Sequence, residues 1–79
     1  MELKSMIREK RTKLGLSQED LAKKLGYSSA MCISNFERGL NKVPLKKLSK
    51  LSKVLGIQKH KIRATVLKEF ENEVSAAMK

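Results

Sequence analysis

Apolar residues recur along this chain at the spacing of one helix face, and glycine or proline separates the recurring blocks. In the first block, Leu3, Ile7 and Leu14 are four and seven residues apart, which predicts a helix from about Glu2 to Leu14. Gly15 follows, and glycine takes the left-handed conformation of a helix C-terminus at little cost. The pattern therefore predicts an amphipathic first helix.

The next two blocks are shorter. Ser17 can cap a helix from about Gln18 to Leu25, because its hydroxyl can accept a hydrogen bond from a free backbone N–H one turn later. After a polar turn, Ile33 and Phe36 share one face of a helix expected from about Ser29 to Glu37. The sequence thus predicts two short helices joined by a tight turn.

Two further helices complete the predicted fold. Pro44 suits the first turn of a fourth helix, where its missing N–H would be unpaired in any case, and Gly56 ends that helix. A last helix is expected from about Lys59 to Ala77, with apolar residues every four positions: Ile62, Val66, Phe70 and Val74. No segment has the alternation of a strand. We therefore expect one all-α, compact five-helix domain over residues 1–79.

The composition excludes several kinds of site. Cys32 is the single cysteine, so no internal disulfide can form, and with His60 as the single histidine there is no zinc set. We expect no metal and no cofactor, and a solvated His60. No paired carboxylates, Ser/His/Asp set or phosphate-binding glycine loop indicates an enzyme. Without a long apolar run or a signal peptide, a cytoplasmic protein with no membrane role is expected.

Charge is the strongest bulk signal. Eighteen Lys and Arg against eight Asp and Glu give a net charge of +10. Residues 1–63 carry sixteen basic and five acidic side chains, whereas residues 64–79 carry two basic and three acidic ones. This basic part favours a polyanion partner. Charge alone also allows a solubilising role, or non-specific binding to nucleic acid or an anionic membrane.

Residues 18–39 contain the pattern of a helix-turn-helix. Two short helices that cross closely need a small residue where they touch, which Ala22 supplies, and Gly26 supplies a free φ for the turn. Leu25, Ile33 and Phe36 would then be buried. The outer face of the second helix is left free to enter a major groove.

The motifs in this region occur in the order Arg11, Leu14-Gly-Leu-Ser-Gln18, Leu21-Ala-Lys-Lys-Leu-Gly26, Ile33-Ser-Asn-Phe-Glu-Arg-Gly39, and Pro44 with Leu48-Ser-Lys-Leu51. They resemble the phage repressor/Cro-like helix-turn-helix family, also called the XRE family, over about residues 4–57. The resemblance implies a lambda-repressor-like fold. It also implies a regulator of transcription, most simply a repressor, that binds specific sequences of double-stranded DNA and is associated with the nucleoid. Six residues separate Gly26 from Ile33, one more than is usual in the family, and we expect the turn at residues 28–30 to absorb it.

The resemblance also gives roles to individual residues. Gln18 matches a glutamine that caps the second helix and touches a phosphate, and its side chain can bridge from a backbone oxygen to the recognition helix. The positions that face base edges are Ser29, Ala30, Met31, Cys32, Ser34 and Asn35. The other positions that hold the sugar–phosphate backbone are Ser28, Arg38, Lys42 and Lys46. Phosphate contacts set register and affinity, whereas base contacts set sequence preference.

The expected reading surface is small and largely apolar. Asn35 is the one side chain there that suits bidentate contact with adenine, and apolar residues such as Met31 can contact thymine methyl groups. We therefore expect an A·T-rich half-site, read partly through DNA shape. In the alternative, Met31 or Cys32 packs into the core. Cys32 is expected to be a small, half-buried residue. The alternative is a redox switch, in which oxidation of a thiol on the DNA face blocks binding.

Two further expectations concern long-range contacts. Arg11 and Glu37 match a family pair that often forms a partly buried ion pair between the first and third helices, although each could be solvated instead. Because one helix-turn-helix reads only a few base pairs, a homodimer is expected, with half-sites about 34–36 Å apart. Candidates for its interface are Ile62, Val66, Phe70 and Val74. These residues could instead cover their own core, or bind a partner protein as in an antitoxin.

Overall fold

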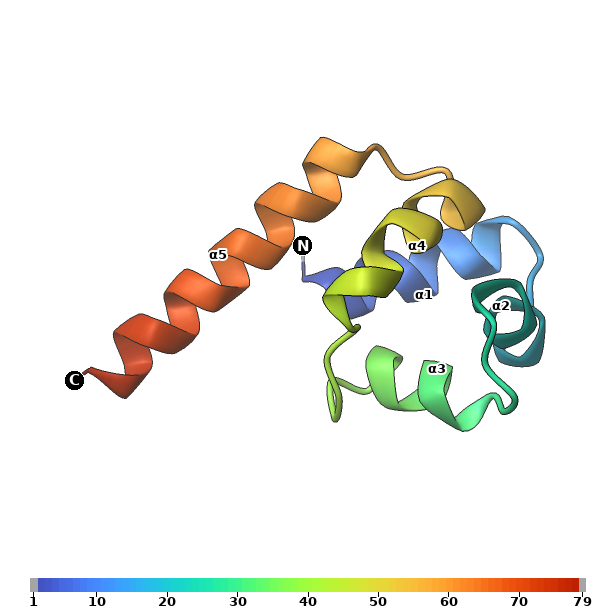
Figure 1. Ribbon diagram of the computed structural model, residues 1–79, viewed down its shortest axis with the longest axis horizontal. Helices are drawn as coiled ribbons and strands as arrows, with labels where there is room; N and C mark the ends of the chain where they lie inside the picture. The colour runs from blue at the N-terminus through green and yellow to red at the C-terminus, as the bar shows by residue number, and fades with distance from the viewer. Residues whose placement is uncertain (1, 79) are drawn as a thin grey trace.

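The computed structural model describes residues 2–78, and within that range it contains α-helices, one short 3₁₀ helix and no strand. The elements are α1 (Leu3–Lys13), α2 (Gln18–Leu25), α3 (Met31–Glu37), η1 (Leu45–Lys47), α4 (Leu48–Leu55) and α5 (Lys59–Ala77). Figure 1 shows α1 to α4 gathered into one body, with the longer α5 running diagonally away from it. The predicted all-α, five-helix class is confirmed. No helix among the described residues is long and apolar enough to cross a membrane.

Helix α2 begins and ends where the sequence predicts. The Ser17 Oγ accepts a hydrogen bond from the Asp20 N–H at 3.0 Å, and an Asp20 carboxylate oxygen accepts one from the Ser17 N–H at 2.9 Å. This reciprocal capping box satisfies two N–H groups at the helix terminus. It also holds the pKa of Asp20 below its ordinary value. The main cause is the hydrogen bond that the carboxylate accepts from the Ser17 backbone, and the interaction with the Ser17 side chain adds to it. At the other end Gly26 has φ 86°, a left-handed conformation that a Cβ would strain.

Two helix starts differ from the prediction. Helix α3 begins at Met31, two residues late, because the Ser29 Oγ accepts from the Met31 N–H at 3.0 Å and keeps the preceding residues in a turn. Pro44 does not open the fourth helix. Its backbone is extended, with φ −58° and ψ 141°, and the turn η1 stands between it and α4.

The core lies where α1, α2, α3 and α4 meet. Its most deeply buried side chains are Ile7, Leu21, Leu25, Ile33, Leu51 and Leu55. Ile62 is the residue of α5 that is buried with them. A core this thin is typical of a domain of this length, so each contact between elements is a large fraction of its stability.

The apolar stripe expected along α5 is divided by the structure. Ile62 is buried in the core of its own chain, and Val66 packs against that core. The interface assignment was therefore wrong for Ile62, because the closeness of α4 encloses that side chain. Phe70 and Val74 stay exposed, at 61% and 39%, in the second half of α5. The C-terminal end of this helix extends beyond the body (Figure 1).

Replacing Ser17 with alanine tests the capping box. The Ser17→Ala variant should lose about 1 kcal/mol of unfolding free energy, because an N–H of the first turn of α2 loses its acceptor. Urea denaturation measures the loss. The matched control is Ser75→Ala, which changes an exposed serine near the end of α5 and should stay within about 0.5 kcal/mol of the parent. Equal stability of the two variants would show that the cap contributes nothing.

Candidate nucleic-acid interface

Helix α3 is held from one side and open on the other. Ile33 and Phe36 are buried against the core, while Met31 at its start is 63% exposed. In Figure 1, α3 lies at the lower edge of the molecule, with α2 beside its N-terminal end. A helix of seven residues would not be stable alone, so these packing contacts fix its position.

An ion pair between Arg11 and Glu37 ties the end of α3 to α1. The Arg11 Nε donates to the Glu37 Oε2 at 2.6 Å, and the Arg11 Nη2 donates to the Glu37 Oε1 at 3.0 Å. The side chains are 12% and 3% exposed. Donation to Glu37 raises the pKa of Arg11 above its ordinary value, against the opposing effect of burial. The expected partly buried pair is therefore present.

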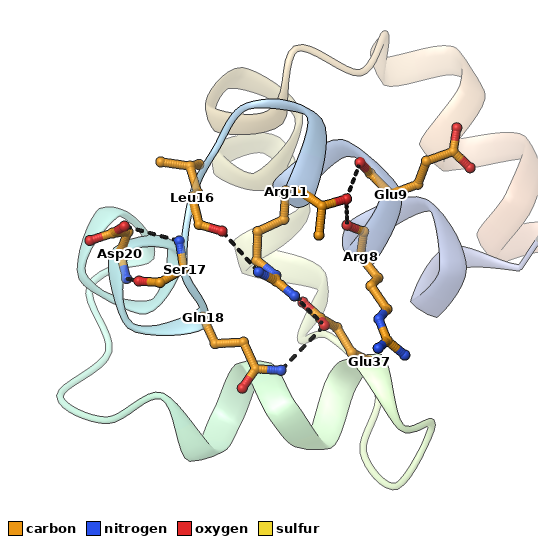
Figure 2. A network of polar contacts seen from close by, with 9 residues as sticks. Arg8, Glu9, Arg11, Leu16, Ser17, Gln18, Asp20 and Glu37 are labelled. Carbon is orange, nitrogen blue, oxygen red and sulfur yellow. Dashed lines mark hydrogen bonds and ion pairs between the residues drawn. The ribbon is translucent and has the colours of Figure 1, made fainter.

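The same pair extends to α2 and to the loop before it. The Arg11 Nη1 donates to the Leu16 carbonyl at 2.8 Å, and the Gln18 Nε2 donates to the Glu37 Oε1 at 3.3 Å. Figure 2 shows Arg11 lying between Leu16 and Glu37, with the Gln18 amide reaching the same carboxylate. One carboxylate thus joins three helices. Glu37 is the last residue of α3, where the helix dipole disfavours a negative charge. The Arg11 guanidinium offsets this unfavourable interaction.

The structure corrects one part of the expected role of Gln18, the cap of α2. The N-cap of α2 is Ser17, and Gln18 is the first residue of the helix. Its side-chain amide is turned toward Glu37 of α3 (Figure 2), so it links the two helices of the motif.

The turn between α2 and α3 is braced by a lysine that the sequence analysis did not identify. Lys47 Nζ donates to the Leu25 carbonyl at the end of α2, at 2.8 Å, and lies 5.0 Å from the centre of the Tyr27 ring. The Tyr27 ring meets Phe36 edge to face, with centroids 6.0 Å apart. A cation at a helix C-terminus offsets the dipole there. Lys47 is 22 residues from Leu25, so no local pattern could have revealed the contact.

Tyr27 is also polar and enclosed. Its hydroxyl is buried and has no hydrogen-bond partner among residues 2–78. Burial raises the pKa of this phenol above its ordinary value. The hydroxyl therefore stays neutral, and the ring packs against the core and Phe36 as an apolar group.

The expected base-facing residues differ in exposure. Met31 is open to solvent, whereas Ala30, Ser34 and Asn35 are half-buried. Cys32 packs partly against the core, which fits the half-buried alternative for this residue. The Ser29 hydroxyl accepts from the Met31 N–H, so one of its lone pairs is already used.

The expected phosphate-contacting residues lie at the edges of α3. Ser28 is exposed in the turn, Arg38 is exposed at the C-cap of α3, and Lys46 is exposed in η1. Lys42 forms an ion pair with Glu73 of α5, and both side chains are more than half exposed. The sequence analysis did not identify this pair. Its members are 31 residues apart, and it joins the loop after α3 to the second half of α5.

Comparison with known proteins places this geometry in a family. A family model described as Helix-turn-helix matches residues 7–62. The chain belongs to this helix-turn-helix family. Among solved structures, a chain of the SinR protein/SinI protein complex is 30% identical, with a TM-score of 0.66 over 96% of this chain and 78% of that chain. A comparison with curated proteins found no match.

These findings confirm the resemblance to XRE-type helix-turn-helix proteins. The chain is a DNA-binding regulator of transcription, and α2 and α3 are the two helices of its motif. Within this helix-turn-helix, the Arg11–Glu37 pair is the polar contact that sets α3 against the rest of the domain.

Removing the Glu37 carboxylate should destabilise the domain strongly. The Glu37→Ala variant leaves Arg11 buried without a counter-charge, a change that costs about 3–5 kcal/mol of unfolding free energy. Thermal and urea denaturation measure it. The control is Glu19→Ala, which removes an exposed partner of Lys23 and should cost less than about 0.5 kcal/mol. Similar losses for both variants would mean that the pair is no more than a surface contact.

Proposed function

We propose that this regulator represses transcription by inserting α3 into the major groove of a specific double-stranded DNA site. The observation that supports this most is the way α3 is mounted. One side of the helix is fixed by Ile33, Phe36 and the Arg11–Glu37 pair, and its N-terminal end presents Met31 to solvent. A rigidly held helix with a free outer face suits base readout, because its side chains keep fixed positions relative to the base pairs.

The basic residues around α3 are suited to hold the DNA backbone. Arg38 follows its last turn, Lys42 lies in the next loop and Lys46 lies in η1. Lys4 adds a charge beside them, since its side chain lies against Gly39. In this proposal these cations bind phosphates on both sides of the groove that α3 enters, and fix its register.

The residues proposed to face the bases favour A·T pairs. Asn35 has the paired donor and acceptor that fit adenine, and Met31 offers an apolar surface to thymine methyl groups. Arginine and lysine, the usual readers of guanine, are missing from α3 itself. The rest of the preference would come from the shape and stiffness of A·T-rich DNA.

Selection of bound sequences from a random double-stranded DNA pool tests the function directly. At near-physiological salt we expect a palindromic, A·T-containing consensus with half-sites about one helical turn apart. Asn35→Ala should relax the preference at one position and weaken specific binding by about 1–3 kcal/mol, with binding to scrambled DNA unchanged. The absence of any consensus would refute specific binding, and a G·C-rich consensus would refute the A·T preference.

Lys42 and Glu73 should change DNA affinity in opposite directions. Lys42→Ala should weaken binding equally on specific and scrambled DNA and lower the salt slope by about one. Glu73→Gln should strengthen binding, because it frees Lys42 and removes a negative charge near the phosphates. Titrations at several salt concentrations measure both effects.

Lys53→Ala is the matched control for this pair. Lys53 is in the last turn of α4, and that end of α4 lies across the body from α3 in Figure 1. Its removal should change binding less than either variant. If Glu73→Gln weakens binding, the carboxylate does not compete with phosphate for Lys42.

A further inference from the structure

Helix α5 carries an apolar stripe that its own chain leaves uncovered. Leu67, Phe70 and Val74 are 57%, 61% and 39% exposed. At a rotation of 100° per residue they lie on one face with Arg63, whereas Ile62 is turned toward the core. Exposed apolar side chains that form a continuous stripe indicate an interaction surface.

The stripe leads into an open groove between α4 and the first half of α5. The groove has a volume of about 590 Å³, and its floor is apolar, with Leu45, Leu48, Val66 and Leu67 among the lining residues. Lys59, His60 and Arg63 line its α5 side. Its occupant should therefore be apolar in the middle and acidic at the edges.

The charges of α5 run against its helix dipole. The first ten residues of the helix, 59–68, carry four cations and no anion: Lys59, Lys61, Arg63 and Lys68. The remaining residues carry three anions and no cation: Glu69, Glu71 and Glu73. Cations near a helix N-terminus and anions near its C-terminus are both unfavourable in an isolated helix. Within the chain Glu73 already pairs with Lys42, and Glu69 accepts a hydrogen bond from the Leu3 N–H at 2.8 Å. An antiparallel neighbour with the same charge order would offset what is left, Glu71 and the cations at the start of α5.

We propose that α5 pairs antiparallel with α5 of a second copy of this chain, about a two-fold axis near Leu67. In this arrangement Phe70 of each copy enters the α4–α5 groove of the other, and Val74 lies against the groove entrance. Arg63 of one copy then faces Glu71 of the other, because their positions are equally far from the axis. Each such contact occurs twice in a two-fold interface.

The second copy fits this surface because the stripe and the groove are complementary within one sequence. The segment 69–74 is acidic, with Phe70 between Glu69 and Glu71 and Val74 directly after Glu73, and the groove is apolar with a basic edge. A two-fold pairing uses both features at once and leaves neither uncovered. The inference rests on the proposed function, which needs a dimer to read a two-fold site, but it is tested without DNA.

Charge reversal at Arg63 and Glu71 tests the antiparallel arrangement. Sedimentation equilibrium without DNA should give a dimer for the parent chain. Arg63→Glu and Glu71→Arg should each raise the dimer dissociation constant about tenfold, because each places like charges together twice. An equimolar mixture of the two variants should recover the parent affinity to within about threefold, since every contact is again between opposite charges.

Two further variants separate the interface from the fold. Phe70→Ala should weaken the dimer at least about thirtyfold, because a central aromatic anchor is lost from both copies. Lys61→Glu is the control: Lys61 lies on the α1 side of α5, beside Met6 and Lys10, and should leave the dimer constant within about twofold. All four positions are exposed, so the circular dichroism spectrum of each folded variant should match that of the parent. The melting temperature should fall only for the variants that weaken the dimer, because association stabilises the native state.

The results divide cleanly. A parent chain that stays monomeric up to about 1 mM overturns the proposal and leaves the groove to an acidic helix of another protein. A dimer unaffected by either charge reversal, or not recovered by the mixture, overturns the antiparallel arrangement. In either case a consensus from the DNA selection would still stand, so failure of the dimer is distinguishable from failure of DNA recognition.

Discussion

The position of α3 depends on the carboxylate of Glu37. This group accepts hydrogen bonds from Arg11 of α1 at 2.6 Å and 3.0 Å and from Gln18 of α2 at 3.3 Å. A single side chain at the end of α3 therefore fixes the position of α3 relative to both preceding helices. Buried ion pairs gain little net stability over apolar packing, but leaving one member alone is costly. The pair therefore acts chiefly by excluding other placements of α3, which the proposed insertion of this helix into a DNA groove would require.

The ion pair can have this effect because so little else holds the helix. With seven residues, α3 has two buried side chains, Ile33 and Phe36, and its N-terminal turn is secured by one serine hydroxyl. Lys47 and Tyr27 then fix the turn between α2 and α3, because Lys47 contacts both the Leu25 carbonyl and the Tyr27 ring. Each contact is small, yet together they define both ends of α3 and leave its outer face free.

The sequence predicts most accurately where local chemistry decides. The bounds of α2 follow from the capping box at Ser17 and the left-handed Gly26, both of which act within one turn. Periodicity alone treated Ile62 and Phe70 as equivalent, because it cannot know that α4 encloses the first and stops short of the second. The Lys42–Glu73 contact was beyond prediction because long side chains on separate elements meet there after folding. For the candidate site, residue types and order were enough to find α3, and exposure of each side chain required the structure.

The acidic residues of the chain are placed where they limit its positive field. Glu37 neutralises Arg11 inside the domain, and Glu73 pairs with Lys42 beside the loop that follows α3. Without these two carboxylates the net charge would rise from +10 to +12, and binding to any DNA through phosphates would be stronger, at the expense of discrimination. Because phosphate contacts carry no sequence information, weakening them leaves a larger share of the binding energy to the side chains of α3. Both proposals therefore draw on the charge order along α5, since Glu73 on one face of that helix pairs with Lys42 while Leu67, Phe70 and Val74 on another face stay exposed.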